Sequence, residues 1–148
     1  MYRSRFRKFI GCIFCSLISG SLYSNYVGFV AIVKGKSMEP TLNPNNSVCS
    51  DIVYVSKLLP VTVNDIVAFK HEDKCLIKRI KAKPGDVVIY DYGNLQIQIQ
   101  PNNFWVIGDG SHSIDSEHFG PISSDQVLGV VTRIIWPPKH WKKLITHD

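Results

Sequence analysis

The sequence is poor in cysteine, and its cysteines are placed wrongly for a disulfide framework or a metal site. It has four cysteines among 148 residues. Cys12 and Cys15 form a C-x-x-C pair, but the pair lies inside an apolar segment and no second pair follows at metal-binding spacing. We therefore interpret them as small residues of a membrane helix. Cys49 and Cys75 are isolated, and we expect both to be packed or free.

Charge is also sparse, and a part of the basic residues lies near the two chain ends. Charged residues make up 20% of the sequence, with 17 Lys and Arg against 12 Asp and Glu, which gives a net charge of +5. The terminal basic residues are Arg3, Arg5, Arg7, Lys8, Lys139, Lys142 and Lys143. Since they form no stripe interleaved with aromatic residues, the composition argues against a nucleic-acid-binding protein.

No charged residue occurs between Phe9 and Val33. A membrane helix needs about 20 mostly apolar residues, so residues 9–26 form a short candidate span. A cleaved signal peptide, a mitochondrial presequence and a retained anchor all fit this composition. We favour the retained anchor, because Val27–Val33 leads with almost no linker into the turn at Ser37. The basic residues before the anchor would stay on the side of the membrane that carries positive loops, opposite the remaining chain.

The expected organisation is a basic tail at residues 1–8, an anchor helix at 9–26 and one domain at 27–148, since a chain of this length accommodates one domain plus an appendage. From residue 27 onward, short β-type runs alternate with turn residues. The expected strands are 27–33, 47–55, 65–70, 74–80, 86–90, 95–100, 104–107 and 127–135. The third and fourth form a hairpin, as do the fifth and sixth. The sequence therefore predicts a mainly β, antiparallel domain.

A serine and a lysine in this domain could form an acyl-transfer site. Ser37 lies in the turn Gly35–Pro40, where glycine lets the backbone turn sharply. A serine hydroxyl is a weak nucleophile until a base takes its proton. Strand alternation places Lys78 on one face with Leu76 and Ile80, and burial of that face would lower the lysine pKa so that it can act as this base. The alternatives are an ordinary serine in a turn and a lysine that keeps a strand edge soluble.

A polar loop further along the chain could support such a pair. The hydroxyl of Ser113 could orient the amine of Lys78, and Asp115 could pair with Arg79 and hold the lysine strand against the loop. An ordinary surface loop is the competing interpretation. A Ser/His/Asp triad is less favoured, because none of the five histidines lies in a triad motif and no G-x-S-x-G is present. A metal hydrolase is disfavoured too, since H-E-x-x-H is absent.

Three segments resemble the main sequence boxes of type I signal peptidases, and they come in the order found in that family: Ser37–Leu42, Lys78–Asp86 and Gly108–Ser116. The resemblance extends over most of the chain from residue 27 to residue 135. It implies a signal-peptidase-like antiparallel β catalytic domain with an N-terminal membrane-anchor helix. It also implies a membrane-anchored serine endopeptidase without a metal ion or an organic cofactor.

The same resemblance assigns roles to the site residues. Ser37 would attack the scissile carbonyl, and Lys78 would act first as general base and then as the acid that protonates the leaving amine. Ser113 would hold the amine of Lys78, while Asp115 and Arg79 would brace the site.

Three departures from the family pattern bear on these assignments. Some relatives carry a hydroxyl residue where this chain has Gly35, so the oxyanion hole would rest on the backbone at Ser37 and Gly35. Glu117 stands where many members place an arginine, which leaves Arg79 as the main expected partner of the supporting aspartate. The loop at residues 108–113 is one residue shorter than usual.

Within the family, the short chain without a large inserted domain and the run Phe119–Ser123 point to the mitochondrial inner membrane protease branch. The tail at 135–144 resembles the second subunit of that protease more than the first. This branch implies a single-pass protein of the mitochondrial inner membrane, with its catalytic domain facing the intermembrane space. Its substrates would be precursors with cleavable presequences, cut near small residues and bound along strand edges. Its partner would be the paralogous subunit 1, in a heterodimer.

Three other interpretations stay open at this point. The chain could be a mainly structural subunit that stabilises its paralogue, although the intact Ser37 and Lys78 argue against this. It could be a bacterial-type signal peptidase, whereas eukaryotic secretory-pathway members typically replace the base lysine with histidine. A LexA-like autoprotease would carry a DNA-binding domain where this chain has its apolar segment.

Overall fold

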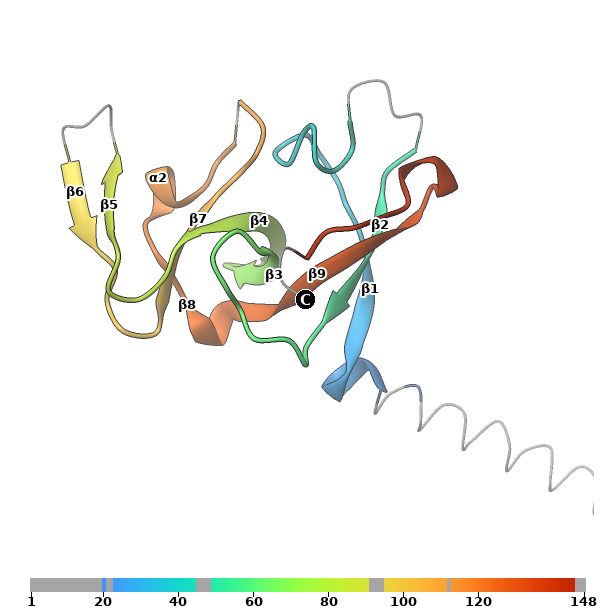
Figure 1. The fold of residues 1–148 in the computed structure, drawn as a ribbon, viewed down its shortest axis with the longest axis horizontal. Helices are drawn as coiled ribbons and strands as arrows, with labels where there is room; N and C mark the ends of the chain where they lie inside the picture. The colour runs from blue at the N-terminus through green and yellow to red at the C-terminus, as the bar shows by residue number, and fades with distance from the viewer. Residues whose placement is uncertain (1–19, 21–22, 45–48, 91–94, 112, 146–148) are drawn as a thin grey trace, which may run out of the picture.

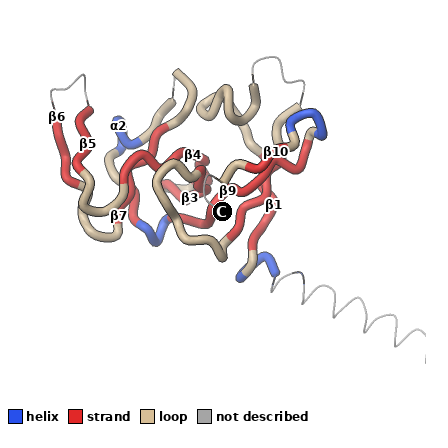
Figure 2. Tube along the Cα trace, viewed as in Figure 1, coloured by secondary structure: helices blue, strands red, loops and turns tan. Residues whose placement is uncertain are grey.

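The structure is a computed structural model that describes residues 20, 23–44, 49–90, 95–111 and 113–145. Strands dominate these residues (Figure 2). The ten strands of the described chain are β1 (Gly28–Ile32), β2 (Ile52–Ser56), β3 (Ile66–His71), β4 (Lys74–Ala82), β5 (Val87–Tyr90), β6 (Leu95–Gln98), β7 (Asn103–Ile107), β8 (Ile122–Ser123), β9 (Val127–Trp136) and β10 (Lys142–Lys143). The helical elements after β1 are short, namely α2 (Ser116–Phe119) and the 3-10 turns η2 (Ser124–Gln126) and η3 (Pro138–His140).

One antiparallel sheet holds most of these strands, in the order β1-β2-β9-β3-β4-β7-β8, with β10 added to β9. β9 is its longest strand, and it pairs with β2 on one side and with β3 on the other. It therefore crosses the middle of the molecule in Figure 1. The hairpin of β5 and β6 is a separate small sheet, and it lies at the opposite end of the molecule from β1 and β2 (Figure 1).

β3 is buried on both faces, which explains its unbroken apolar start. Successive strand residues point to opposite faces. Ile66 and Ala68 join a cluster formed with β2, β9 and the loop after β1. Val67 and Phe69 join a second cluster on the other face, formed with β4, β7, β8 and β9. The centre of the sheet is thus enclosed on both sides. A polar side chain that points inward from β4 is therefore removed from contact with water.

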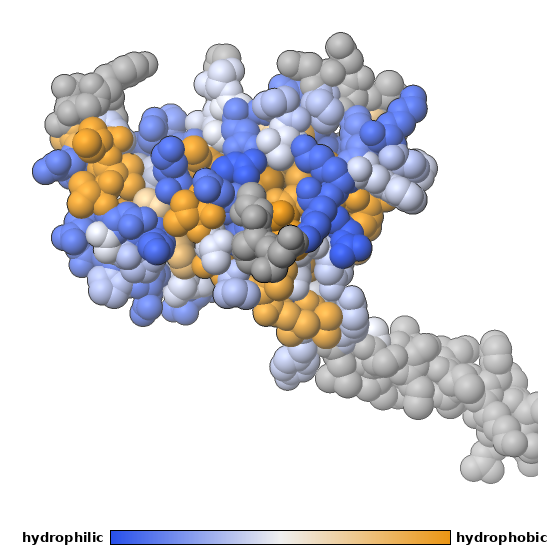
Figure 3. Space-filling model, in the orientation of Figure 1, coloured by the Kyte–Doolittle hydropathy of each residue, from blue (hydrophilic) through white to orange (hydrophobic). Residues whose placement is uncertain are grey.

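Apolar side chains are exposed at both ends of the molecule. Val87, Ile89 and Leu95 lie on the β5–β6 hairpin, where apolar atoms gather at the upper left of Figure 3. Val30 and Ile32 are exposed on β1. Since β1 ends the strand order, one edge of it is left for another extended chain.

The prediction of a mainly antiparallel β domain is confirmed, and both expected hairpins are present. The short elements α2, β8 and β10 were not predicted, because two to four residues carry no periodic signal. Cys49 and Cys75 are free and exposed. The predicted basic tail and most of the predicted anchor at 9–26 lie outside the described residues. In the part of the chain that the structure describes, no helix has the length and apolar character to cross a membrane.

Truncating Phe69 tests the second cluster. Phe69 is 0% exposed, and we expect Phe69→Ala to lower the free energy of unfolding by about 3–5 kcal/mol, since it leaves a cavity in a closely packed core. Leu58→Ala is the control, because Leu58 is 67% exposed and its truncation should change stability by less than about 0.5 kcal/mol. Urea unfolding of the full chain measures both values. Equal losses in the two variants would contradict this description of the core.

Candidate active site

Ser37 lies in a loop of residues 33–43 between β1 and β2, which we call the Ser37 loop. Two apolar side chains on either side of the turn, Met38 and Leu42, are buried in the first cluster and anchor it to the sheet. The amide of Leu42 donates to the carbonyl of Met38 at 2.9 Å, and the amide of Glu39 donates to that of Lys36 at 3.1 Å. The loop is therefore a compact turn fixed by its own hydrogen bonds and by the core.

Lys78 lies in the middle of β4 and is only 3% exposed. Its strand runs between β3 and β7, and Ile80 on the same face is buried too. The alternation predicted from the sequence is confirmed, and the interpretation of Lys78 as a solubilising edge residue is wrong. Burial lowers the pKa of Lys78 below the ordinary lysine value of 10.5, although the charges of Asp115 and Asp109 act in the opposite direction.

Ser113 holds the amine of Lys78. The ammonium nitrogen Nζ donates to Ser113 Oγ at 2.8 Å, which is the contact expected from the sequence. The loop that carries Ser113 packs directly on the Ser37 loop, since the amide of Gly110 donates to the carbonyl of Ser37 at 3.0 Å. A Cβ at Gly108 would overlap Ser113, and one at Gly110 would overlap the carbonyl oxygen of Lys36. Only glycine at these two positions allows the two loops to approach so closely.

The expected pair of Asp115 with Arg79 is wrong, because Arg79 pairs with Asp109. Its guanidinium donates from Nε to Oδ1 at 2.9 Å and from NH2 to Oδ2 at 2.6 Å. It also donates to the carbonyl of Asn64 at 2.8 Å and to Thr41 Oγ1 at 3.4 Å. Neighbours in a strand point to opposite faces, so Arg79 is directed away from the face of Lys78. The guanidinium thus ties β4 to both the Ser113 loop and the end of the Ser37 loop.

Asp115 supports the site from the lysine face instead. It is buried, its Oδ2 accepts from the amide of Gly108 at 3.0 Å, and its Oδ1 accepts from the amide of Glu117 at 3.3 Å. It is the N-cap of α2. Glu117, which replaces an arginine of many relatives, is exposed in the first turn of that helix.

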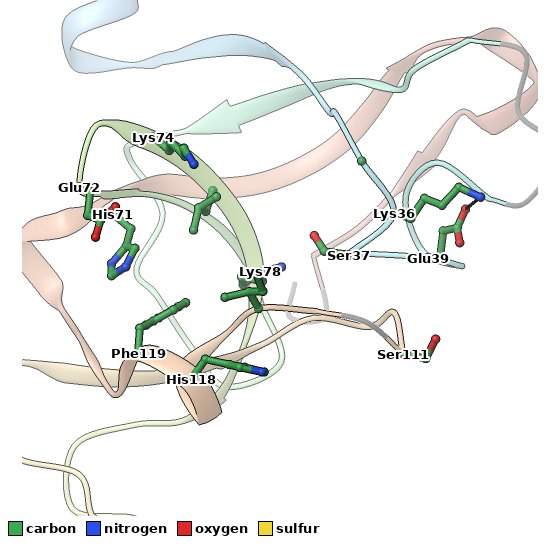
Figure 4. Close-up of a pocket in the computed structure, with 13 residues that line it drawn as sticks. Lys36, Ser37, Glu39, His71, Glu72, Lys74, Lys78, Ser111, His118 and Phe119 are labelled. Carbon is green, nitrogen blue, oxygen red and sulfur yellow. Dashed lines mark ion pairs between the residues drawn. The ribbon is translucent and has the colours of Figure 1, made fainter.

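Ser37 borders two pockets, which also share Gly35 and Leu76 as lining residues. The smaller has a volume of about 160 Å³, with Val33, Met38 and Ile77 among its lining residues. The larger has a volume of about 790 Å³ and extends from Ser37 past Lys78 to Phe119 (Figure 4). Ser37 and Lys78 thus border the same cavity, although no hydrogen bond joins their side chains in the described chain.

The backbone before Ser37 is arranged so that its amide can meet a substrate. Gly35 has φ +84°, a conformation that favours glycine, and it borders both pockets. The amides of Gly35 and Ser37 donate to no acceptor among the residues that the structure describes. A donor beside the hydroxyl that lacks a partner can stabilise an oxyanion.

One buried polar pair was missed by the sequence analysis. His140 Nδ1 lies 2.7 Å from Oδ1 of Asp51, a carboxylate that is 0% exposed. The pair resembles two thirds of a Ser/His/Asp triad, yet within the described residues His140 has no serine partner. No group of three metal-ligating side chains was found in the described segments either.

Gly110 gives a direct test of the contact between the two loops. An added methyl group must push the Ser113 loop off the carbonyl of Lys36, so we expect Gly110→Ala to break the hydrogen bond from residue 110 to Ser37. Hydrogen exchange of that amide should become about tenfold faster or more. Gly85→Ala is the control: alanine is strained there by the φ of +90°, but its Cβ meets no atom, so the substitution adds strain in the turn after β4 without touching the two loops and should leave the protection of the Gly110 amide unchanged. Unchanged protection in Gly110→Ala would contradict the close approach.

Comparison with known proteins gives the family. The family model described as signal peptidase, peptidase S26, matches residues 6–103, which include Ser37 and Lys78. Subunit 2 of the mitochondrial inner membrane protease of Mus musculus is 34% identical over 96% of this chain and 86% of its own length. The subunit 2 of Saccharomyces cerevisiae is 38% identical over 80% of this chain and 73% of its own length.

A subunit 1 is related as well, that of Schizosaccharomyces pombe, which is 32% identical over 83% of this chain and 83% of its own length. The resemblance to type I signal peptidases, and among them to subunit 2 of the mitochondrial protease, is confirmed. With its β-sheet domain and these relatives, the chain belongs to the signal peptidase family, peptidase S26, and is a signal-peptidase-type protease.

Proposed function

We propose that this chain is a membrane-bound serine endopeptidase that removes sorting presequences from precursors delivered to the mitochondrial intermembrane space. Ser37 is the nucleophile and Lys78 is its general base. The observation that carries the proposal is the burial of the Lys78 amine against Ser113, in the same cavity that Ser37 borders. A buried lysine with a lowered pKa has little structural purpose, whereas a base near neutral pH requires it.

The reaction follows from these positions. Neutral Lys78 takes the proton of Ser37 Oγ as this oxygen attacks the scissile carbonyl carbon. The backbone amide of Ser37 stabilises the oxyanion that forms. Lys78 then gives its proton to the leaving amine, and the carbon–nitrogen bond breaks to leave an ester on Ser37. A water molecule, deprotonated by Lys78, hydrolyses the ester and restores the serine.

The smaller pocket can take one substrate side chain next to the cut. Its volume of about 160 Å³ is far below the roughly 790 Å³ of the adjoining cavity, so it has room for a single side chain. The free edge of β1 runs into this pocket through Ile32 and Val33. A substrate segment in extended conformation can therefore add to β1 and place one side chain beside Ser37.

The proposed location and partner rest on the relatives. Those of mouse and yeast are named as subunits 2 of the mitochondrial inner membrane protease, and a fission yeast relative is named as a subunit 1. We place the chain in the same membrane, crossing it once through residues 9–26, with the catalytic domain in the intermembrane space. Its partner is a paralogous subunit 1 in a heterodimer. Neither a metal ion nor an organic cofactor takes part in the proposed reaction.

Substitution of the two central residues tests the function. Ser37→Ala and Lys78→Ala should each lower kcat/KM for a synthetic precursor peptide by at least about 10³-fold, since each removes an obligatory step. Lys81→Ala is the matched control, because Lys81 lies on the same strand but is exposed, and it should keep wild-type activity. The assay uses the purified full chain, alone and with a subunit 1 paralogue.

If both catalytic variants cut as well as wild type while the heterodimer forms, the chain is a structural subunit and the proposed chemistry fails. If only the heterodimer cuts, and does so in a Ser37-dependent way, the chain is catalytic but needs its partner.

The pH dependence of kcat/KM tests whether Lys78 is the base. Because the base must be neutral, kcat/KM should rise with pH as Lys78 loses its proton, with a midpoint below 10.5. Asp115 raises the pKa of Lys78, so Asp115→Asn should move this rise to lower pH. Asp125→Asn, on the exposed turn η2, is the control and should leave the profile unchanged. If Asp115→Asn leaves the midpoint of this rise unchanged, or moves it to higher pH, the rise comes from a group other than Lys78.

A further inference from the structure

One side chain closes the base of the Ser37 loop. Nδ2 of Asn43, at the end of the loop, donates to the carbonyl oxygens of Val33 at 2.9 Å and Gly35 at 3.0 Å, at its start. Asn43 has φ +50°, a conformation that asparagine tolerates better than most residues. The entry and the exit of the loop are therefore held together by a single amide group.

Asp51 fixes Asn43 in turn. Its backbone amide donates to Asn43 Oδ1 at 2.7 Å, and its Oδ2 accepts from the backbone amide of Asn43 at 2.8 Å. The carbonyl of Asp51 also accepts from the amide of Val33 at 2.8 Å. Asn43 and Asp51 thus exchange hydrogen bonds in both directions, which leaves the asparagine amide one orientation.

The last partner comes from the end of the chain. The second oxygen of Asp51 is 2.7 Å from His140 Nδ1, across 89 positions of sequence. Because Asp51 is 0% exposed, its carboxylate needs a partner on both oxygens, and His140 supplies the one that the Ser37 loop does not. η3, which carries His140, is held to the sheet by β10 on β9 and by the amide of Leu144 on the carbonyl of Thr132.

We infer that His140, Asp51 and Asn43 are positioning residues for Ser37, so that the C-terminal segment holds the nucleophile in place. This inference rests on the proposed function. Asn43 fixes the carbonyl of Gly35 and with it the peptide plane between Gly35 and Lys36. The Ser37 amide lies in the following peptide plane, so its direction, and that of the hydroxyl, builds on the fixed plane through the dihedral angles of Lys36. A misplacement of about 1 Å in a reacting group can cost about 10²-fold in rate.

The variant Asn43→Gly isolates the side-chain bonds. Glycine keeps the positive φ and the backbone bond to Asp51, and loses only the amide group. We expect kcat for the precursor peptide to fall about 10- to 100-fold with KM changed by less than about threefold. Asn102→Gly is the matched control, because Asn102 has φ +62° and its side chain bonds to no described residue. It should keep kcat within about twofold.

His140 tests the far end of the same chain of contacts. His140→Ala should lower kcat, and His140→Gln, which can still donate to Asp51, should restore part of the loss. The double variant Asn43→Gly with His140→Ala should lose less than the product of the two single effects, because both act through one network. Independent effects that multiply, or no rescue by glutamine, would overturn the inference.

Hydrogen exchange decides the inference without an activity assay. In Asn43→Gly and His140→Ala, the amides of Glu39 and Leu42 in the Ser37 loop should exchange about tenfold faster or more, while that of Ile80 in β4 should not change. If those loop amides keep their protection, the network does not hold the loop and the inference is wrong. If Asn43→Gly retains full kcat while Ser37→Ala is inactive, the proposed function stands and the inference fails. If the wild-type heterodimer shows no Ser37-dependent cleavage, the function fails, and accelerated exchange would still support the positioning of the loop.

Discussion

The desolvation of one amine is the constraint on which the site depends. Lys78 can serve as a base only when its charged form is destabilised, and burial of the amine has this effect. β4 buries the lysine because this strand lies between β3 and β7, in the central part of the sheet. The amine also contacts Ser113, whose hydroxyl accepts from it at 2.8 Å without adding a charge. A carboxylate in that place would raise the pKa of the lysine and weaken it as a base.

The geometry of β4 places Lys78 and Arg79 on different faces of the strand. Lys78 and Arg79 are neighbours, so they point to opposite faces of β4. The lysine side carries the cavity and Ser113, while the guanidinium side carries the pair with Asp109. One strand thus sets the position of the proposed base and of a cation that ties down both loops. Because the guanidinium is fully paired with a carboxylate, its charge is compensated before it can act on the amine.

The sequence alone predicted the parts of the site that depend on periodicity. Alternation along β4 placed Lys78 inward, and the turn composition singled out Ser37. It could not predict the partner of Arg79, since the choice between Asp109 and Asp115 depends on the path of a loop through Gly108 and Gly110. The contact between Asp51 and His140 could not be predicted for a similar reason. No local sequence pattern indicates that two residues 89 positions apart are neighbours in the fold. The strand order, too, follows from long-range pairing by β9 rather than from any local pattern.

Burial of Lys78 also bears on the choice between a peptidase and a structural subunit. Removing an amine from water costs free energy, and one hydrogen bond to Ser113 offsets only part of it. An apolar side chain of similar length would fill the same place at lower cost, and two loop glycines would be unnecessary if no second loop had to reach the amine. A chain that served only to stabilise its paralogue would gain stability by losing these features. The proposed proton transfer at Ser37 would account for their presence together, whereas a purely structural role gives no reason for it.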